Sequence, residues 1–161
     1  MIRRLNHAVL FVRGAIVSSE FYIKMLGFEV SGSMGTTGVF LSTPKSGNDH
    51  DLALFGVGAH AAASEAGRRS VGLYHLAWEV DTLAELVEVR DRLAASGALH
   101  GATNHGVSRS LYAKDPDGLG FEVMWEVPAD VVDPAIDLPG LAPLDLDADI
   151  ARFGPETTRN R

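Results

Sequence analysis

The chain contains no cysteine among its 161 residues. Disulfide bonds, thiolate metal sites and cysteine nucleophiles are therefore excluded together. A metal ion could be held only by histidine, aspartate or glutamate side chains. Six histidines and 21 acidic residues are available for that role.

Long hydrophobic runs and an excess of positive charge are also missing. No apolar stretch approaches the roughly 18 residues of a membrane-spanning helix, and the amino terminus enters a strand-like pattern instead of a signal peptide. The chain has 14 Lys and Arg residues and 21 Asp and Glu residues, which gives a net charge of -7. Nucleic acids and anionic membranes attract clustered positive charge, so neither is expected as a partner. We expect a cytoplasmic protein that acts on small molecules.

What the chain does have is a predicted β-hairpin with one unusual side chain. Ser108 to Ala113 reads as a strand, Asp115 to Gly118 as a tight turn and Phe121 to Trp125 as the returning strand. Glu122 places a carboxylate in the middle of this apolar strand, where an unpaired charge is costly. A cationic partner or a metal ion is therefore expected opposite Glu122.

The order of predicted elements occurs twice. Leu5-Asn6-His7 opens one strand-like segment, and Leu73-Tyr74-His75 opens another 68 residues later. The first module combines a strand at 5–12, a helix at 15–26 and strands at 28–31, 39–43 and 51–57. The second combines a strand at 73–80, a helix at 83–95 and the hairpin. The sequence therefore predicts an α+β fold of two tandem βαβββ modules, at about 3–58 and 72–127.

Beyond Val127 the composition changes. Five prolines occur from Pro128 to Pro155 among scattered aspartates. We predict that 128–161 forms an extended, proline-rich arm that wraps the sheet or a neighbouring molecule, with a helical turn at about 145–153 and a frayed end. The domain proper is then 1–127.

Equivalent places in the two modules would bring three metal-ligating side chains together. If a pseudo-twofold axis relates the modules, His7 and His75 face each other and Glu122 lies beside the strand of His75. Two imidazoles and one carboxylate form the facial triad associated with non-haem Fe(II), which leaves coordination positions open. Taken singly, each of these residues is more ordinarily a polar group satisfied by its neighbours. Together with the repeat, they predict a metal site.

These motifs resemble those of one family. The segments LNHAVLFV, LYHLAWEV and HGVSRSLYAKDPDGLGFEV are similar to the vicinal oxygen chelate superfamily of glyoxalase I, bleomycin resistance proteins and extradiol dioxygenases. The resemblance covers roughly residues 3–127, and the final hairpin is most similar to single-domain catechol 2,3-dioxygenase-like members. It implies a curved, partly closed sheet around a metal cavity, with Fe(II), or Mn(II) in its place, bound by His7, His75 and Glu122.

The same resemblance implies three further catalytic residues. His60 lies 15 residues before His75, Tyr112 lies 10 before Glu122, and His105 lies 17 before Glu122, at spacings similar to those of extradiol enzymes. These side chains would bind a catechol-type diol or exchange protons with it while O2 occupies the metal, with Arg109 as a partner either of an anion or of a residue behind the site. The expected partners are thus an aromatic diol and O2, and the family relation implies a homo-oligomer.

Two other functions stay open. A glyoxalase-like lyase or isomerase would use Ni(II) or Zn(II) and a fourth ligand from the strand at 51–57. The residue there in register with Glu122 is Ala53 or Leu54, and neither can bind a metal. A drug-binding resistance protein, the third alternative, would need no metal.

Three polar residues and five aromatic ones complete the candidates. His50 and Asp51 begin the strand at 51–57, where they face solvent or cap the turn, and Glu126 is a second carboxylate on the face of Glu122. The aromatic side chains that could line a pocket are Phe11, Phe40, Phe55, Trp78 and Trp125.

Overall fold

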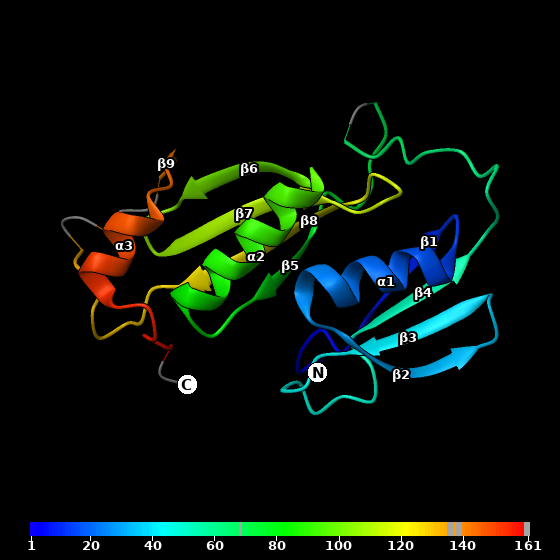
Figure 1. The fold of residues 1–161 in the computed structure, drawn as a ribbon, viewed down its shortest axis with the longest axis horizontal. Coiled ribbons are helices and arrows are strands. Elements are labelled where there is room, and N and C mark those ends of the chain that lie inside the picture. The colour runs from blue at the N-terminus through cyan, green and yellow to red at the C-terminus, as the bar shows by residue number, and fades with distance from the viewer. Residues whose placement is uncertain (68, 135–136, 138–139, 160–161) are drawn as a thin grey trace. The chain divides into compact units, whose positions relative to one another are not determined.

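Two compact units make up the chain in its computed structural model, which describes residues 1–67, 69–134, 137 and 140–159. One unit contains Met1–Ser64 and Asp115–Gly118, and the other contains Glu65–Lys114 and Leu119–Arg161. Figure 1 shows the strands and helices of each unit. None of the described helices is both long and apolar enough to cross a membrane.

The first unit is a mixed four-stranded sheet with one helix. Its strand order is β1-β4-β3-β2, in which β1 is parallel to β4 and the other pairs are antiparallel. Helix α1 packs on β3 and β4 (Figure 1). The elements are β1 (Ala8–Val12), α1 (Ala15–Leu26), β2 (Glu29–Met34), β3 (Gly38–Ser42) and β4 (Leu52–Gly56).

The second unit repeats this arrangement and adds to it. Its strand order is β5-β8-β7-β6-β9, with β5 parallel to β8 and the other pairs antiparallel. Helix α2 packs on β6 and β8, and α3 packs on α2. The elements are β5 (Leu76–Glu79), α2 (Leu83–Ser96), β6 (Leu99–Asn104), β7 (Ser108–Lys114), β8 (Gly120–Glu126), β9 (Ala142–Pro143) and α3 (Leu146–Phe153).

The α+β class and the two βαβββ modules are confirmed. The strands form two mixed sheets, and neither is closed into a barrel among the described residues. The helices begin where they were predicted, and Gly27 and Gly97 end them with φ of 75° and 74°, a conformation that glycine adopts without steric cost. The range of β6 was not predicted, because its sequence LHGATN has few strand-forming residues and carries a bulge near Gly101.

The two repeated histidines lie just outside their strands. The sequence placed His7 and His75 inside strands, but β1 begins at Ala8 and β5 at Leu76. The ladder with β4 starts only at the Ala8 N–H, which donates to the Asp51 carbonyl at 3.0 Å. Each histidine is therefore the residue before a strand, and the 68-residue offset between them is kept.

One face of each sheet packs against helices and forms the core. In the first unit this face and α1 contribute Leu41, Leu52, Leu54, Tyr22 and Met25. In the second unit the buried core includes Leu86, Leu93, Leu111, Val123 and Trp125. Because side chains alternate along a strand, the residues between these positions point to the opposite face. Tyr112 and Glu122 lie on that opposite face of the second sheet.

The residues after Val127 extend the second sheet. Strand β9 pairs with β6, and Trp125 Nε1 donates to the carbonyl of Thr157 at 3.1 Å. A helix was predicted at 145–153, and the structure has α3 there, capped by the Asp145 side chain. Of the predicted arm, residues 135, 136, 138, 139, 160 and 161 lie outside the described part of the chain.

The start of α2 gives a stability test. Thr82 Oγ1 accepts a hydrogen bond from Glu85 N at 3.1 Å, and Glu85 Oε2 accepts one from Thr82 N at 3.2 Å, which is a capping box. Thr82→Ala should lower the free energy of unfolding by about 1 kcal/mol, and Thr82→Ser by about half of that or less. Urea denaturation followed by circular dichroism measures both. Equal stability of the two variants would show that the cap contributes nothing.

Candidate functional site

A histidine and a glutamate meet on the side of the second sheet that faces away from the helix-covered core. Glu122 lies in the middle of β8, next to Ala77 of the parallel strand β5 and opposite Tyr112 of the antiparallel strand β7. His75 lies just before β5, two residues before Ala77 and therefore on the same face. Its Nε2 atom is 3.0 Å from Glu122 Oε2. The partner expected opposite the buried carboxylate is thus His75.

This pair is buried enough for its charges to matter. Glu122 is only 9% exposed, and an isolated carboxylate at such a position would lose most of its hydration. His75 can neutralise Glu122 when it is protonated, and a metal ion between the two would do the same. The Nδ1 atom of His75 is also buried and receives no hydrogen bond from any described residue.

The donor pair fits a metal ion. Two ligands bound side by side to one ion, each at about 2.1 Å, lie about 3.0 Å apart. This is the separation of His75 Nε2 and Glu122 Oε2. Imidazole nitrogen and carboxylate oxygen are also the donor types of non-haem Fe(II), Zn(II) and Ni(II) sites.

A second polar pair lies beside the first. The Nε2 atom of His105 is 2.8 Å from Tyr112 Oη, and the ring of Tyr112 is centred 5.9 Å from that of His75. Burial raises the pKa of the Tyr112 phenol above its ordinary value of 10.0, and the negative charge of Glu122 raises it further. The structure therefore brings His75, Glu122, Tyr112 and His105 together on one face.

Tyr74 and Gly120 shape the same region, and the sequence reading missed both. The ring of Tyr74 is centred 4.8 Å from that of His75. A Cβ atom at Gly120 would lie 2.9 Å from the Tyr74 carbonyl oxygen, so only glycine lets β8 approach the residue before His75 this closely. The available signals were the position of Tyr74 next to the repeated histidine and a glycine at the start of a strand.

In the first unit the ring of His7 packs against that of His50, a histidine that was not predicted as a metal ligand. The rings of His7 and His50 are centred 4.4 Å apart, and His7 Nδ1 is 2.8 Å from Asn6 Oδ1. His50 in turn holds Asp49, and this hydrogen bond lowers the pKa of the Asp49 carboxyl. Of the two roles considered for Asp51, the structure shows the turn cap, because Asp51 accepts from Thr43 N at 2.7 Å and is buried.

The six predicted site residues are thus divided between the two units. His75, Glu122, His105 and Tyr112 lie in the second unit, whereas His7 and His60 lie in the first. His60 is exposed in the turn after β4. Within the described residues, no three His, Asp or Glu side chains gather into a cluster able to hold a metal ion. The three-ligand site remains a prediction.

The register of the two modules places Ala53 where the other module has Glu122. Val9 of β1 pairs with Ala53 of β4, and Ala77 of β5 pairs with Glu122 of β8. Val9 and Ala77 are themselves 68 residues apart, the same offset as His7 and His75. Of the two residues considered for this position, Ala53 is therefore the equivalent of Glu122, and its methyl group cannot bind a metal.

Two other polar candidates have partners elsewhere. Glu126 forms a salt bridge with Arg159, so its charge is already neutralised. Arg109 is on the opposite face of the sheet from Tyr112, because it is separated from Tyr112 by an odd number of positions in β7. It is 1% exposed and bound to Asp149, so of the two roles predicted for Arg109 the structure contradicts that of an anion partner in the site.

The aromatic candidates are also divided between the two faces of their sheets. Trp78 and Trp125 alternate with Ala77 and Glu122 and so lie on the helix-covered side of the second sheet. In the first unit, Phe11 is on the side of His7, and Phe55 pairs with it in register. Phe40 packs edge-on against both Phe55 and His50.

Comparison with known proteins identifies relatives of this fold and sequence. The family model described as Glyoxalase/Bleomycin resistance protein/Dioxygenase superfamily matches residues 4–123. The catechol-2,3-dioxygenase of Bacillus subtilis (strain 168) is 30% identical over 125 residues, which are 77% of this chain and 42% of that protein. The biphenyl-2,3-diol 1,2-dioxygenase 3 of Rhodococcus globerulus is 34% identical over 116 residues, 71% of this chain and 59% of that protein. The chain spans about half the length of these curated relatives.

Solved structures share the fold. A glyoxylase/bleomycin resistance protein/dioxygenase domain from Frankia sp. EAN1pec has a TM-score of 0.64 at 22% identity, over 79% of this chain and 100% of that one. A fosfomycin resistance protein from Listeria monocytogenes has a TM-score of 0.58 at 19% identity, over 79% of this chain and 96% of that one. With the matched family model and the repeated βαβββ units, these findings show that the chain belongs to the glyoxalase/bleomycin resistance/dioxygenase superfamily, the vicinal oxygen chelate proteins.

Proposed function

We propose that this chain is an extradiol ring-cleaving dioxygenase that inserts O2 into a catechol-type vicinal diol at a mononuclear Fe(II). The ligands in this proposal are His7, His75 and Glu122, and the reaction belongs to residues 1–127. The observation that carries it is the His75–Glu122 donor pair beside the Tyr112–His105 pair on one face of the second sheet. The two curated relatives, whose names denote diol and catechol dioxygenases, support the same reaction class.

The metal and the protein contribute different parts of this chemistry. Fe(II), or Mn(II) in its place, would supply coordination positions at which both diol oxygens and O2 bind together. His75 and Glu122 would hold it, and the negative charge of Glu122 would offset its positive charge. Both oxygen atoms of O2 enter the product, so the overall reaction needs no external reductant.

Proton transfers would fall to the tyrosine and the histidines. With the hydrogen of His105 on Nδ1, Tyr112 Oη would donate to His105 Nε2 and keep a lone pair that accepts from a hydroxyl of the diol. His60 remains the proposed base that takes a proton from the substrate, because imidazole is the side chain that most often serves as a general base.

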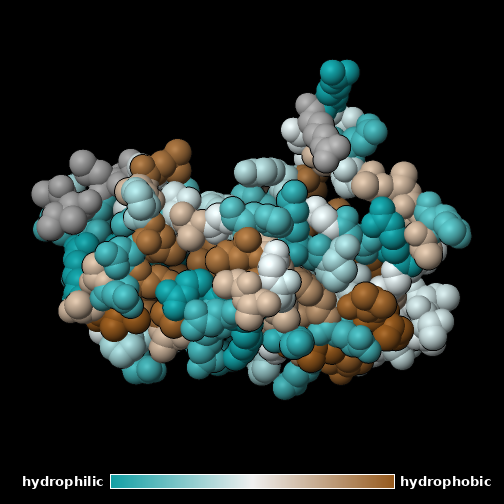
Figure 2. Space-filling view, turned by 45° about the horizontal axis from the view of Figure 1, so that its top comes forward, coloured by the Kyte–Doolittle hydropathy of each residue, from teal (hydrophilic) through white to brown (hydrophobic). Residues whose placement is uncertain are grey.

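The apolar face around His7 favours an aromatic substrate. Hydrophobic side chains reach the molecular surface in several places (Figure 2), and Val9 and Phe11 are among the exposed ones. Both alternate with the core residues of β1 and so share the face of His7. Phe11 is 74% exposed, which is costly for a large apolar side chain unless a ligand covers it.

The glyoxalase-like alternative has less support. A lyase or isomerase with Ni(II) or Zn(II) and four protein ligands would need a carboxylate at the position of Ala53. The drug-binding alternative gives no role to the His75–Glu122 pair. Both alternatives are nevertheless included as outcomes of the functional test.

The functional test starts with anaerobic Fe(II) reconstitution. Catechol and 2,3-dihydroxybiphenyl are then added in air, while an oxygen electrode and the absorbance of the yellow ring-cleavage product are followed. The proposal expects oxygen uptake with equimolar product. Hemithioacetal isomerisation by the Ni(II) or Zn(II) form, without oxygen uptake, would favour the lyase, and binding of an aromatic drug without any metal would favour the resistance protein.

Two substitutions test the metal ligands. His75→Ala and Glu122→Gln should each lose stoichiometric Fe(II) binding while staying folded, because a single ligand contributes much of the affinity. His100→Ala is the matched control, since His100 is an exposed histidine of β6 outside the site. Metal analysis after gel filtration measures the bound ion. Full occupancy in either variant would remove that residue from the ligand set.

Tyr112 should stay protonated well into the alkaline range. The raised pKa predicts that its phenolate absorbance in the metal-free protein, taken as wild type minus Tyr112→Phe, appears only above pH 10. Glu122→Gln removes one cause of the shift and should bring the transition down in pH. Tyr112→Phe should also lower kcat while metal occupancy is kept. A phenolate transition below pH 10 would contradict the described environment.

Phe11→Ala tests the aromatic face. Loss of an apolar contact with the ring should raise KM for 2,3-dihydroxybiphenyl roughly tenfold and leave metal binding intact, because burying a phenyl side chain is worth about 1.5–3 kcal/mol. Val17→Ala is a suitable control, since Val17 is an exposed apolar residue of α1. Unchanged KM would place the substrate away from this face.

A further inference from the structure

The turn that carries His105 is held by residues from the end of the chain. His105 follows β6 and precedes β7. Its backbone carbonyl accepts a hydrogen bond from Gly140 N at 3.3 Å, and its Nδ1 atom is 3.2 Å from the Gly140 carbonyl oxygen. Next to this contact, Ala142 and Pro143 of β9 pair with Asn104 and Thr103 of β6.

The contact with Gly140 determines which nitrogen of His105 carries the hydrogen. A carbonyl oxygen only accepts, so the bond requires a hydrogen on Nδ1. In the neutral ring, Nε2 then has a lone pair, and it accepts from Tyr112 Oη at 2.8 Å. The chain of hydrogen bonds therefore runs from Tyr112 through His105 to the Gly140 carbonyl. With the other tautomer the bond to the Gly140 carbonyl would be lost, and Nε2 would donate to Tyr112 Oη instead of accepting from it.

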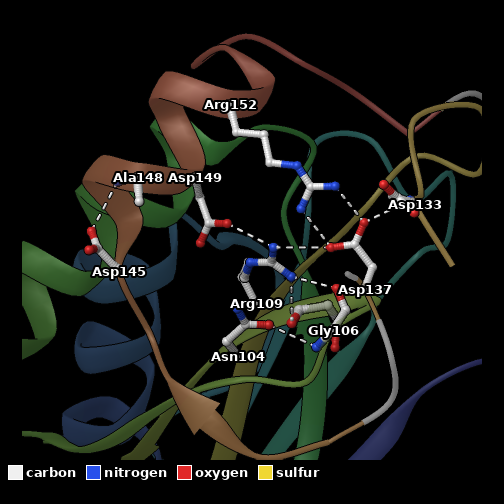
Figure 3. A network of polar contacts seen from close by, with 10 residues as sticks. Asn104, Gly106, Arg109, Asp133, Asp137, Asp145, Ala148, Asp149 and Arg152 are labelled. Atoms are coloured by element: carbon white, nitrogen blue, oxygen red, sulfur yellow. Dashed lines mark hydrogen bonds and ion pairs between the residues drawn. The ribbon is translucent and has the colours of Figure 1, made fainter. Parts of the chain in front are cut away.

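A buried ionic network holds the other side of this turn (Figure 3). Arg109 Nη1 donates to the carbonyl of Gly106, the residue after His105, at 2.6 Å. Arg109 Nη2 is 2.7 Å from Asp149 Oδ1 of α3 and 3.9 Å from Asp137 Oδ1. Arg152 of α3 binds both oxygens of Asp137 at 2.7 Å.

This network is suited to holding the Gly106 carbonyl in place. Two guanidinium groups face two carboxylates, so the charges of the network balance. Arg109, Asp137 and Asp149 are all buried. Removing one partner would leave an uncompensated buried charge, which resists any movement that separates them. The carbonyl of Gly106 is therefore anchored to α3 through Arg109.

We propose that Gly140 and helix α3 form a positioning element for proton transfer, in which Asp149 and Arg109 hold the turn of His105 and Gly140 selects its Nδ1–H tautomer. This inference rests on the proposed function for its effect on turnover. Its structural part, the tautomer of His105, stands independently of any reaction. Asp149 and Arg109 act only through His105 and are positioning residues.

The first experiment measures the tautomer in the full-length, metal-free protein. Nitrogen-15 NMR of histidine-labelled protein distinguishes protonated from unprotonated ring nitrogens, and comparison with His105→Gln assigns the signal of His105. The proposal expects a neutral His105 with the hydrogen on Nδ1. A hydrogen on Nε2 would overturn the proposal, whether or not the metal-loaded protein cleaves a diol. If His105 has the expected tautomer but the protein shows no turnover, only the proposed function is contradicted.

The second experiment breaks the ion pair between Asp149 and Arg109. Asp149→Asn removes the charge that holds Arg109, and Asp147→Asn is its matched control, because Asp147 is an exposed carboxylate in the same first turn of α3. In Asp149→Asn the Nδ1–H signal should give way to a mixture of tautomers, and kcat should fall roughly tenfold or more with KM and metal content unchanged. Asp147→Asn should match the wild type. Identical tautomer populations in the two variants would overturn the role of Asp149.

Discussion

A carboxylate in the middle of a sheet has to be neutralised, and the second unit is arranged around that requirement. Glu122 lies among the core residues of β8, and strands on both sides of it limit access of water. His75 meets it from the strand start beside it, and Tyr112 faces it from β7. Because the charge of Glu122 also acts on the phenol, the His75–Glu122 pair and the Tyr112–His105 pair are electrostatically coupled. A change at Glu122 therefore affects both His75 and Tyr112.

The repeat explains how the predicted ligands are distributed over the two units. Both modules place a histidine directly before their first strand, and the same register relates the first and last strands of each. The modules differ at one decisive position, where the first has Ala53 and the second has Glu122. Two equal half-sites would supply two histidines and two carboxylates. The alanine leaves three ligand candidates, a set associated with open coordination positions for substrate and O2.

Much of this arrangement could be predicted from local patterns. The 68-residue offset, the glycines that end the helices and the isolated Glu122 were visible because strand, helix and turn signals act over a few residues. The contact of His7 with His50 and that of His105 with Gly140 were not visible, since each joins residues brought together only by folding. Arg109 was misplaced for a simpler reason. Its charge indicated a role in the site, but its position in β7 directs it into the core, where Asp149 from a proline-rich segment neutralises it.

The ionic network under the second sheet should respond very differently to salt and to acid. Dissolved ions screen charges that are in contact with water, and Arg109, Asp137 and Asp149 are largely removed from it. High ionic strength should therefore leave α3 attached to the sheet. Acid acts directly on the carboxylates. The hydrogen bond from Arg152 lowers the pKa of Asp137 below its ordinary value, so its stabilising contribution is complete above about pH 4 and disappears as the pH falls through the lowered pKa. The attachment of α3 to the second sheet should thus persist at high ionic strength and be lost in strong acid.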